Sequence, residues 1–161
     1  MISDIVPLGE RVFSSSDVSR LAGVSLRQLQ WWDERKLVPA RMEEHRRVYL
    51  THQVLEILAV AALRRKGVSL QKTRRLLRLL RRELDGIDGG FWSGNAQAYL
   101  VTDASSLAVT GDAEQALSRI ARAAKPMYVV SLGDEIRHIV FDQGRQRHRT
   151  SQLRLFEDAD A

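Results

Sequence analysis

The sequence predicts a mainly α-helical protein with a small α+β part, and three observations support this prediction. Helix-capping residues and apolar positions at helical spacing recur between residues 15 and 85. Four glycines within residues 85–95 interrupt that pattern. Beyond them, short apolar runs typical of strands flank another helical period.

The same pattern divides the chain into four parts. We expect a helical domain over residues 11–86, a glycine-rich linker over 87–96 and a small α/β domain over 97–141. Residues 142–161 form a basic and then acidic stretch, which we expect to be a mobile tail.

Composition excludes several classes of protein. The 161 residues are 44% hydrophobic and 28% charged, which favours a folded chain over a disordered or collagen-like one. The absence of cysteine excludes disulfides and thiolate metal sites. The longest apolar run, Val54 to Leu63, is interrupted by Glu56 and is shorter than the about 20 residues of a membrane span. Because the first residues carry no secretory signal, we expect a cytoplasmic protein.

Charge is distributed unevenly along the chain. Residues 11–86 carry 17 basic and 8 acidic side chains, whereas residues 87–161 carry 8 basic and 10 acidic ones. A basic first half indicates a polyanionic partner. Of the 25 basic residues 21 are arginine, which suits bidentate contacts to phosphate and guanine, although a GC-rich genome would produce the same bias.

The first predicted helix is short. Ser15 or Ser16 can cap it, and it extends through Ala22. Gly23 then breaks the chain, because glycine adopts positive φ at little cost.

The second predicted helix begins at Ser25, with Gln28 three residues later in the capping-box position. It extends to about Lys36, and Pro39 closes it. Two helices joined in this way form a helix-turn-helix, in which the second helix is the recognition helix.

A small β wing is expected next. Residues 38–42 and 46–50 have the short, β-like pattern of two strands, and residues 43–45 lie at the tip between them. The far strand is basic, which would place positive charge beside the second helix.

Two longer helices complete the predicted helical domain. Thr51 caps a helix over 52–66 that Gly67 ends, and Ser69 caps a helix over 70–84. An apolar stripe on the fourth helix favours packing against the third helix over a coiled coil, because it spans only about two heptads. The stripe consists of Leu70, Thr73, Leu77, Leu80 and Leu84.

The small α/β part is predicted to be a ββαβα unit. Residues 99–101 and 107–109 form a hairpin, a helix follows from a cap near Asp112, and a strand over 127–132 precedes a helix over 134–141. Such a small core leaves little volume for a ligand pocket of several hundred cubic ångströms. The unit could sense a small-molecule effector, but for this reason we favour oligomerisation or a protein partner. The central helix places apolar residues on one face: Ala113, Ala116, Leu117, Ile120 and Ala124.

Three sequence segments resemble those of the MerR family of transcriptional regulators. Gly23 to Asp33 (GVSLRQLQWWD) is similar to the family's recognition-helix segment, which usually reads GVSxRTLRYYE. Arg46–Tyr49 (RRVY) and Leu63–Leu70 (LRRKGVSL) continue the match in order and spacing. The resemblance covers the 72 residues from Phe13 to Leu84. It implies a winged helix-turn-helix of four helices and a β wing that binds double-stranded promoter DNA as a dimer.

Residues expected to meet DNA surround the second helix. Arg27 and Gln28 lie at its start, where arginine can bond guanine and glutamine can bond adenine, unless both are merely solvated. Arg20 and the run 64–66 are placed to meet phosphates. Tyr49 either donates its hydroxyl to a phosphate or fixes the wing. The full predicted set is Arg20, Ser25, Arg27, Gln28, Gln30, Trp31, Arg35, His45, Arg46, Arg47, Tyr49, Arg64, Arg65 and Lys66.

The resemblance adds roles for three of these residues. It implies that Trp31, Arg46 and Arg47 contact phosphates, whereas Leu29 and Trp32 pack into the core. The sequence departs from the family at three positions, with Gln30 in place of arginine and with Lys36 and Arg46 in place of glycine.

Dimerisation requires a different solution from that of the family. Family members continue into a long helix that forms a coiled coil, but the glycines at 86, 89 and 90 leave no room for one here. We expect dimerisation through residues 97–141, either by an exposed strand edge or by burial of Phe91 and Trp92.

Other function classes have less support. Four histidines (His45, His52, His138 and His148) lack metal-ligand spacing, so we expect no metal, no cofactor and no enzymatic activity. One alternative is an antitoxin-like or adaptor module that binds a protein through its C-terminal half. Another is an architectural or excisionase-type protein that bends DNA. The favoured hypothesis is a sequence-specific DNA-binding transcriptional regulator in the cytoplasm, associated with the nucleoid.

Overall fold

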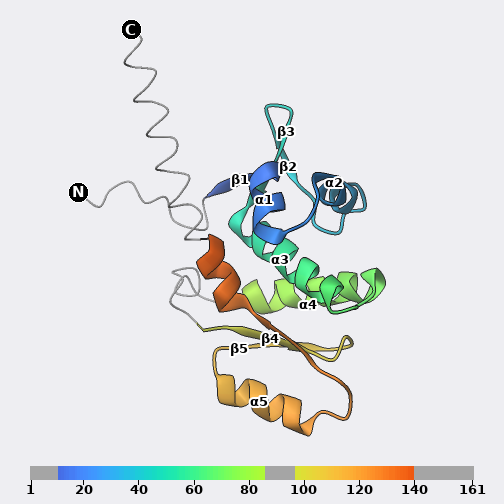
Figure 1. Ribbon diagram of the computed structural model, residues 1–161, viewed down its shortest axis with the longest axis vertical. Helices are drawn as coiled ribbons and strands as arrows, with labels where there is room; N and C mark the ends of the chain where they lie inside the picture. Colours follow the sequence, from blue (N-terminus) through green and yellow to red (C-terminus); the bar gives the residue numbers. More distant parts are fainter. Residues whose placement is uncertain (1–10, 86–96, 140–161) are drawn as a thin grey trace, which may run out of the picture.

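The structure, a computed structural model, describes residues 11–85 and 97–139. In it a pair of long helices lies between two small antiparallel sheets (Figure 1). One sheet and two short helices lie at one end of the molecule, and a further sheet and helix lie at the other (Figure 1).

Two short helices follow the first strand. Helix α1 spans Ser15–Ala22 and is capped by Ser14, whose hydroxyl accepts from the Asp17 amide at 3.2 Å. The predicted caps Ser15 and Ser16 are therefore wrong, because both residues lie inside the helix. Gly23 ends α1 at φ +65°, in the left-handed region. Helix α2 spans Leu26–Glu34 and ends before the predicted Lys36.

The first sheet has the order β1-β3-β2. Its strands are β1 (Val12–Ser14), β2 (Arg41–Glu43) and β3 (Arg46–Leu50), all antiparallel. The sequence did not predict β1, which pairs with the far strand of the hairpin. Strand β2 starts three residues later than the predicted 38–42 and includes Glu43, which was expected at the tip, whereas Val38 lies before it in the core, only 1% exposed.

The long helices α3 (Thr51–Arg65) and α4 (Leu70–Asp85) form the centre. Leu50 is the N-cap residue of α3, and its amide donates to the Gln53 side chain at 2.9 Å. Thr51, the predicted cap, is instead a fully buried residue of the first turn. Helix α4 packs on α3 through its apolar stripe, as the core-packing alternative predicts. The buried residues of α4 are Thr73, Leu76, Leu77 and Leu80.

The second sheet has the order β5-β4-β6. Its strands are β4 (Tyr99–Thr102), β5 (Leu107–Thr110) and β6 (Tyr128–Ser131), and helix α5 (Ala113–Arg122) links the last two. Residues 132–139 are helical, two residues earlier than predicted. One face of this sheet packs on α3 and α4, and the other is covered by α5 (Figure 1).

The described residues share one continuous hydrophobic core. Leu100 and Val130 of the second sheet belong to the same buried cluster as Leu58 of α3 and Leu76 of α4. Helical residues Leu132, Ile136 and Ile139 join it as well. The predicted linker (87–96), with Phe91 and Trp92, and the predicted tail (142–161) lie outside the described residues. The division into domains stays a prediction.

Candidate nucleic-acid interface

Helix α2 is anchored on one side and exposed on the other. Leu29 and Trp32 are each only 1% exposed, as expected from the sequence. The opposite side displays Arg27 and Gln28 to solvent, together with Gln30, whose amide donates to Glu34 at 2.8 Å. An amphipathic helix fixed in this way holds its polar face at a defined orientation.

The amino end of α2 carries a regular cap. The Ser25 hydroxyl accepts from the Gln28 amide at 3.1 Å, which satisfies one of the free amides of the first turn. Arg27 and Gln28 stand in that first turn, where a helix that enters a groove end-on meets bases. Ser25 therefore caps α2 as predicted, and its contact with DNA stays a prediction.

Hairpin β2–β3 turns tightly beside α2 (Figure 1). Glu43 pairs with Arg46, so that Glu44 and His45 alone form the turn, at φ +47° and +65°. Two left-handed residues in succession define the turn type that matches the twist of the strands. His45 and Arg46 are exposed at this tip.

Asp33 joins the hairpin to α2. One carboxylate oxygen accepts from the Arg47 Nε at 2.7 Å, and the other accepts from the Ala40 amide at 2.9 Å. The hydrogen bond to Asp33 raises the pKa of Arg47 above its usual value. Sequence analysis assigned no role to Asp33, although it stands where the resemblance has an acidic residue after the aromatic pair. Arg47, predicted to contact phosphate, is held by this carboxylate.

Tyr49 lies in the core instead of on the surface. It pairs with Phe13 of β1 and is fully buried, and this burial raises the pKa of its phenol above the usual value. A phosphate cannot reach a buried hydroxyl, so the phosphate contact predicted for Tyr49 is wrong for this conformation. The other alternative, that Tyr49 fixes the hairpin, agrees with its position.

On the surface, the side chain of Trp31 in α2 contacts that of Arg35, the residue that follows the helix. The Arg35 guanidinium lies 5.2 Å from the centre of the Trp31 ring, within cation–π range. Trp31 remains 38% exposed. The carbonyl of Arg35 accepts from Arg74 of α4 at 3.2 Å, which connects the end of α2 to the central helices.

The predicted phosphate-binding cations around α3 also make local contacts. Arg65 donates to the Ala22 carbonyl at 3.1 Å and thereby caps α1, and Arg64 donates to the Val68 carbonyl at 2.8 Å. Arg20 of α1 lies 3.4 Å from Asp17. All three remain exposed, as does Lys66 at the end of α3.

A buried ion pair supports the segment that follows α2. Glu56 of α3 is 4% exposed, and both of its carboxylate oxygens accept from Arg81 of α4 at 3.0 Å. Arg81 also donates to the Leu37 carbonyl at 3.0 Å. This hydrogen bond fixes the chain between α2 and β2, and sequence analysis assigned a role to neither Glu56 nor Arg81.

Comparison with known proteins gives one family match. The sequence model of the MerR HTH family regulatory proteins matches residues 13–80. Over this range the chain is similar to a MerR-type helix-turn-helix domain. The crystal structure of HiNmlR, a MerR family regulator lacking the sensor domain and bound to promoter DNA, is similar at a TM-score of 0.41 and 12% identity. That similarity covers 88% of this chain and 80% of that chain. Among curated proteins none matches the sequence.

The matched residues comprise α1, α2, the hairpin, α3 and most of α4. Twelve of the fourteen predicted site residues are exposed, Arg47 is half-buried and Tyr49 is buried. Within residues 11–85 and 97–139, no group of three or more histidine or acidic side chains is suited to hold a metal ion. Over the same residues, no helix is both long and apolar enough to cross a membrane.

Proposed function

We propose that the protein is a sequence-specific DNA-binding transcriptional regulator that reads its site with α2. The observation that carries this proposal is the pairing of an exposed first turn, with Arg27 and Gln28, to a hairpin that Asp33 holds beside it. In a helix-turn-helix this turn enters the major groove. Arg27 would then bond guanine O6 and N7, and Gln28 would bond adenine N6 and N7.

The surrounding cations would set the position of the domain on the duplex. The hairpin acts as the wing, with Arg46 and His45 at its exposed tip directed to the phosphate backbone. Trp31, Arg35 and Lys66 would add contacts on the flanks of α2. Such contacts fix register and orientation but do not read sequence.

We also propose that the regulator is a homodimer in the cytoplasm, associated with the nucleoid. The exposed apolar side of α5 supports dimerisation, because Leu117 is 64% exposed and Ile120 is 36% exposed. Helix α5 lies at the end of the molecule opposite α2 and the hairpin (Figure 1). A dimer joined there would leave both reading helices accessible.

Fluorescence anisotropy on two duplexes tests the reading role. One duplex carries the DNA upstream of the protein's own gene, the other carries the same bases in scrambled order, and both are titrated across a salt series. We expect tighter binding to the native duplex near physiological salt. Arg27→Ala should cost about 1–3 kcal/mol on that duplex and little on the scrambled one.

Arg82→Ala is the matched control, since it removes the same charge from an exposed position in the last turn of α4 that belongs to none of the proposed sites. It should leave native-duplex affinity unchanged. Equal losses by Arg27→Ala on both duplexes would contradict base reading, and equal wild-type binding to both would contradict sequence specificity.

A further inference from the structure

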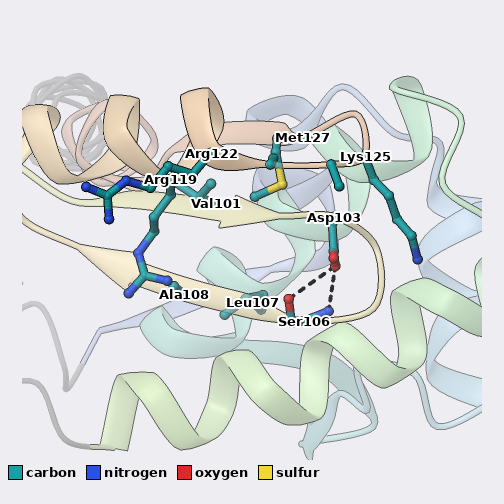
Figure 2. A pocket seen from close by; sticks show the side chains of 11 residues that line it. Val101, Asp103, Ser106, Leu107, Ala108, Arg119, Arg122, Lys125 and Met127 are labelled. Carbon is teal, nitrogen blue, oxygen red and sulfur yellow. Dashed lines mark hydrogen bonds between the residues drawn. The ribbon is translucent and has the colours of Figure 1, made fainter.

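A pocket opens between the second sheet and the C-terminal half of α5 (Figure 2). Its volume is about 460 Å³, within the range of small-molecule sites. The expectation that this unit has too little volume for a ligand is therefore wrong. The physical reason is that Arg119 and Arg122 of α5 and the small Ala123 and Ala124 after it line this side, where no bulky apolar side chain fills the space.

The lining combines an apolar floor with basic ends. Val101 and Ala108 supply apolar surface from the sheet, and Met127 supplies it from the loop between α5 and β6. Arg119 and Arg122 lie together at one end of the view, and Lys125 lies at the other (Figure 2). Within the described residues, neither arginine forms an ion pair with a carboxylate.

The single acidic residue of the lining is already engaged. Asp103 accepts hydrogen bonds from the Ser105 and Ser106 amides, both at 2.8 Å, and from the Ser106 hydroxyl at 3.2 Å (Figure 2). These bonds lower the pKa of Asp103 and direct its carboxylate into the β4–β5 turn. Asp103 therefore stays ionised, and the charge it feels is that of Lys125, whereas the arginine end has no ion pair with an acid among the described residues.

These cations are not placed for the duplex. Helix α5 contacts β4 and β5, and it lies at the end of the molecule opposite α2 and the hairpin (Figure 1). A DNA segment on the α2 face would not reach them. An apolar floor also has no use for a phosphate backbone, whereas it suits the hydrocarbon part of a small molecule.

We infer that this pocket binds a small organic anion with an apolar body. The carboxylate or sulfonate of the ligand bonds Arg119 and Arg122, because planar guanidinium groups match such anions in bidentate fashion. The hydrocarbon or aromatic part covers Val101, Ala108 and Met127. This assigns a ligand site to the C-terminal unit, beyond the proposed DNA binding and independent of it.

Isothermal titration calorimetry of the full chain with three matched probes tests the site. Phenylbutyrate, phenylbutanol and phenylbutylamine share one apolar body and differ in charge. Phenylbutyrate should bind saturably, and the alcohol should bind at least about tenfold more weakly because it forms no charge-assisted bonds. The amine should bind least.

Two variants address the two halves of the pocket. The exposed double variant Arg119→Ala/Arg122→Ala should weaken phenylbutyrate binding by roughly tenfold or more and bring it to the level of the alcohol. Ala108→Leu keeps every charge but fills the floor, so all three probes should lose affinity. Arg27→Ala, far from the pocket, should bind phenylbutyrate as the wild type does.

Three results would overturn the inference: equal affinity for the carboxylate and the alcohol, unchanged affinity in the double arginine variant, or no saturable binding of phenylbutyrate at millimolar concentration. Because the titration contains no DNA, each of these results is separate from a failure of the anisotropy experiment. Thermal unfolding of each variant verifies that its fold is intact.

Discussion

Asp33 shows how much of the interface depends on one side chain. Its two oxygens hold the hairpin strand through Arg47 and the entering chain through Ala40. Both contacts are between residues distant in sequence, and both fix the angle between hairpin and α2. Without them α2 would keep its cap and its apolar anchors, and β3 would keep its pairing with β1, but no side chain would join the hairpin to α2 through Asp33.

We expect Asp33→Ala to lower the free energy of unfolding by about 1–2 kcal/mol. Hydrogen bonds to charged groups contribute about 1.5–3 kcal/mol, and solvent screening reduces the Arg47 pair. Urea unfolding followed by circular dichroism measures the loss. Glu34→Ala is the control, because Glu34 is also acidic and adjacent but bonds only Gln30 within the described residues. Comparable losses in both variants would refute the joining role.

Lys36 occupies a backbone conformation that favours glycine. Its φ is +54°, at the position where the family resemblance has glycine. A side chain in the left-handed region costs about 1–2 kcal/mol, partly offset by the greater freedom of an unfolded glycine.

Lys36→Gly should therefore raise the free energy of unfolding by up to about 1 kcal/mol. Lys66→Gly is the matched control, because Lys66 has φ −80° and gains nothing from glycine. Chemical denaturation of both variants decides the matter. Stabilisation in neither, or in both alike, would contradict the strain argument.

Sequence reasoning succeeded at residues whose role is local. Ser25 caps α2, and Leu29 and Trp32 are buried, because a cap and an apolar period depend on neighbours within one turn. It failed where partners are far apart in sequence. Nothing near Asp33 specifies Ala40 or Arg47, and the core position of Tyr49 depends on pairing with an unforeseen strand.

At the scale of elements, the Glu56–Arg81 pair connects α3, α4 and the chain after α2. Glu56 is nearly completely buried, so its charge depends on Arg81 for compensation. Breaking a buried pair is costly because one charge stays without a partner, whereas replacing both by apolar residues can be nearly neutral.

Arg81→Met should destabilise the protein by about 3 kcal/mol, the lower end for buried pairs because Arg81 is partly exposed. The double variant Glu56→Leu/Arg81→Met should recover most of that loss. A double-mutant cycle in urea provides the measurement. If the double variant is as unstable as the single one, the cost arises from lost packing and not from the orphaned carboxylate.

The ends of helices and strands were also predicted correctly where their cause is local, and missed where it is a distant partner. The turn at Gly23, the helix after Ser69 and the cap at Asp112 come from local signals and lie where predicted. Strand β1 has only three residues and gains its structure from β3, so its own sequence carries too short a pattern. Thr51 is predicted as the cap because threonine is a common capping residue, but Leu50 holds that position and its amide donates to the Gln53 side chain.

At the scale of the whole molecule, the end with α2 and the hairpin and the second sheet are joined by one core through α3 and α4. The glycines at 86, 89 and 90 predict a boundary between two units, and composition alone does not show that β5 packs on α4. The pocket beside α5 could not be predicted either, because its volume depends on which side chains of the second sheet and of α5 face each other.

Leu117→Glu/Ile120→Glu should convert the dimer to a monomer. Charged side chains on the proposed contact would oppose each other across the two-fold axis, whereas both positions are exposed and should leave the subunit folded. Size-exclusion chromatography with light scattering measures the mass. Gln115→Glu adds charge elsewhere on α5 as a control. A wild-type monomer, or a dimer that survives the double change, would refute this arrangement.

Four described residues other than glycine have positive φ: Lys36, Glu44, His45 and Ala104. Each is a place where one substitution to glycine would relieve strain. Such a chain lies below the stability that its fold allows, as most natural proteins do. In evolutionary terms, relief at these turns would permit the proposed reading face of α2 to accept destabilising changes, so that the DNA sequence it is proposed to recognise could change while the fold persists.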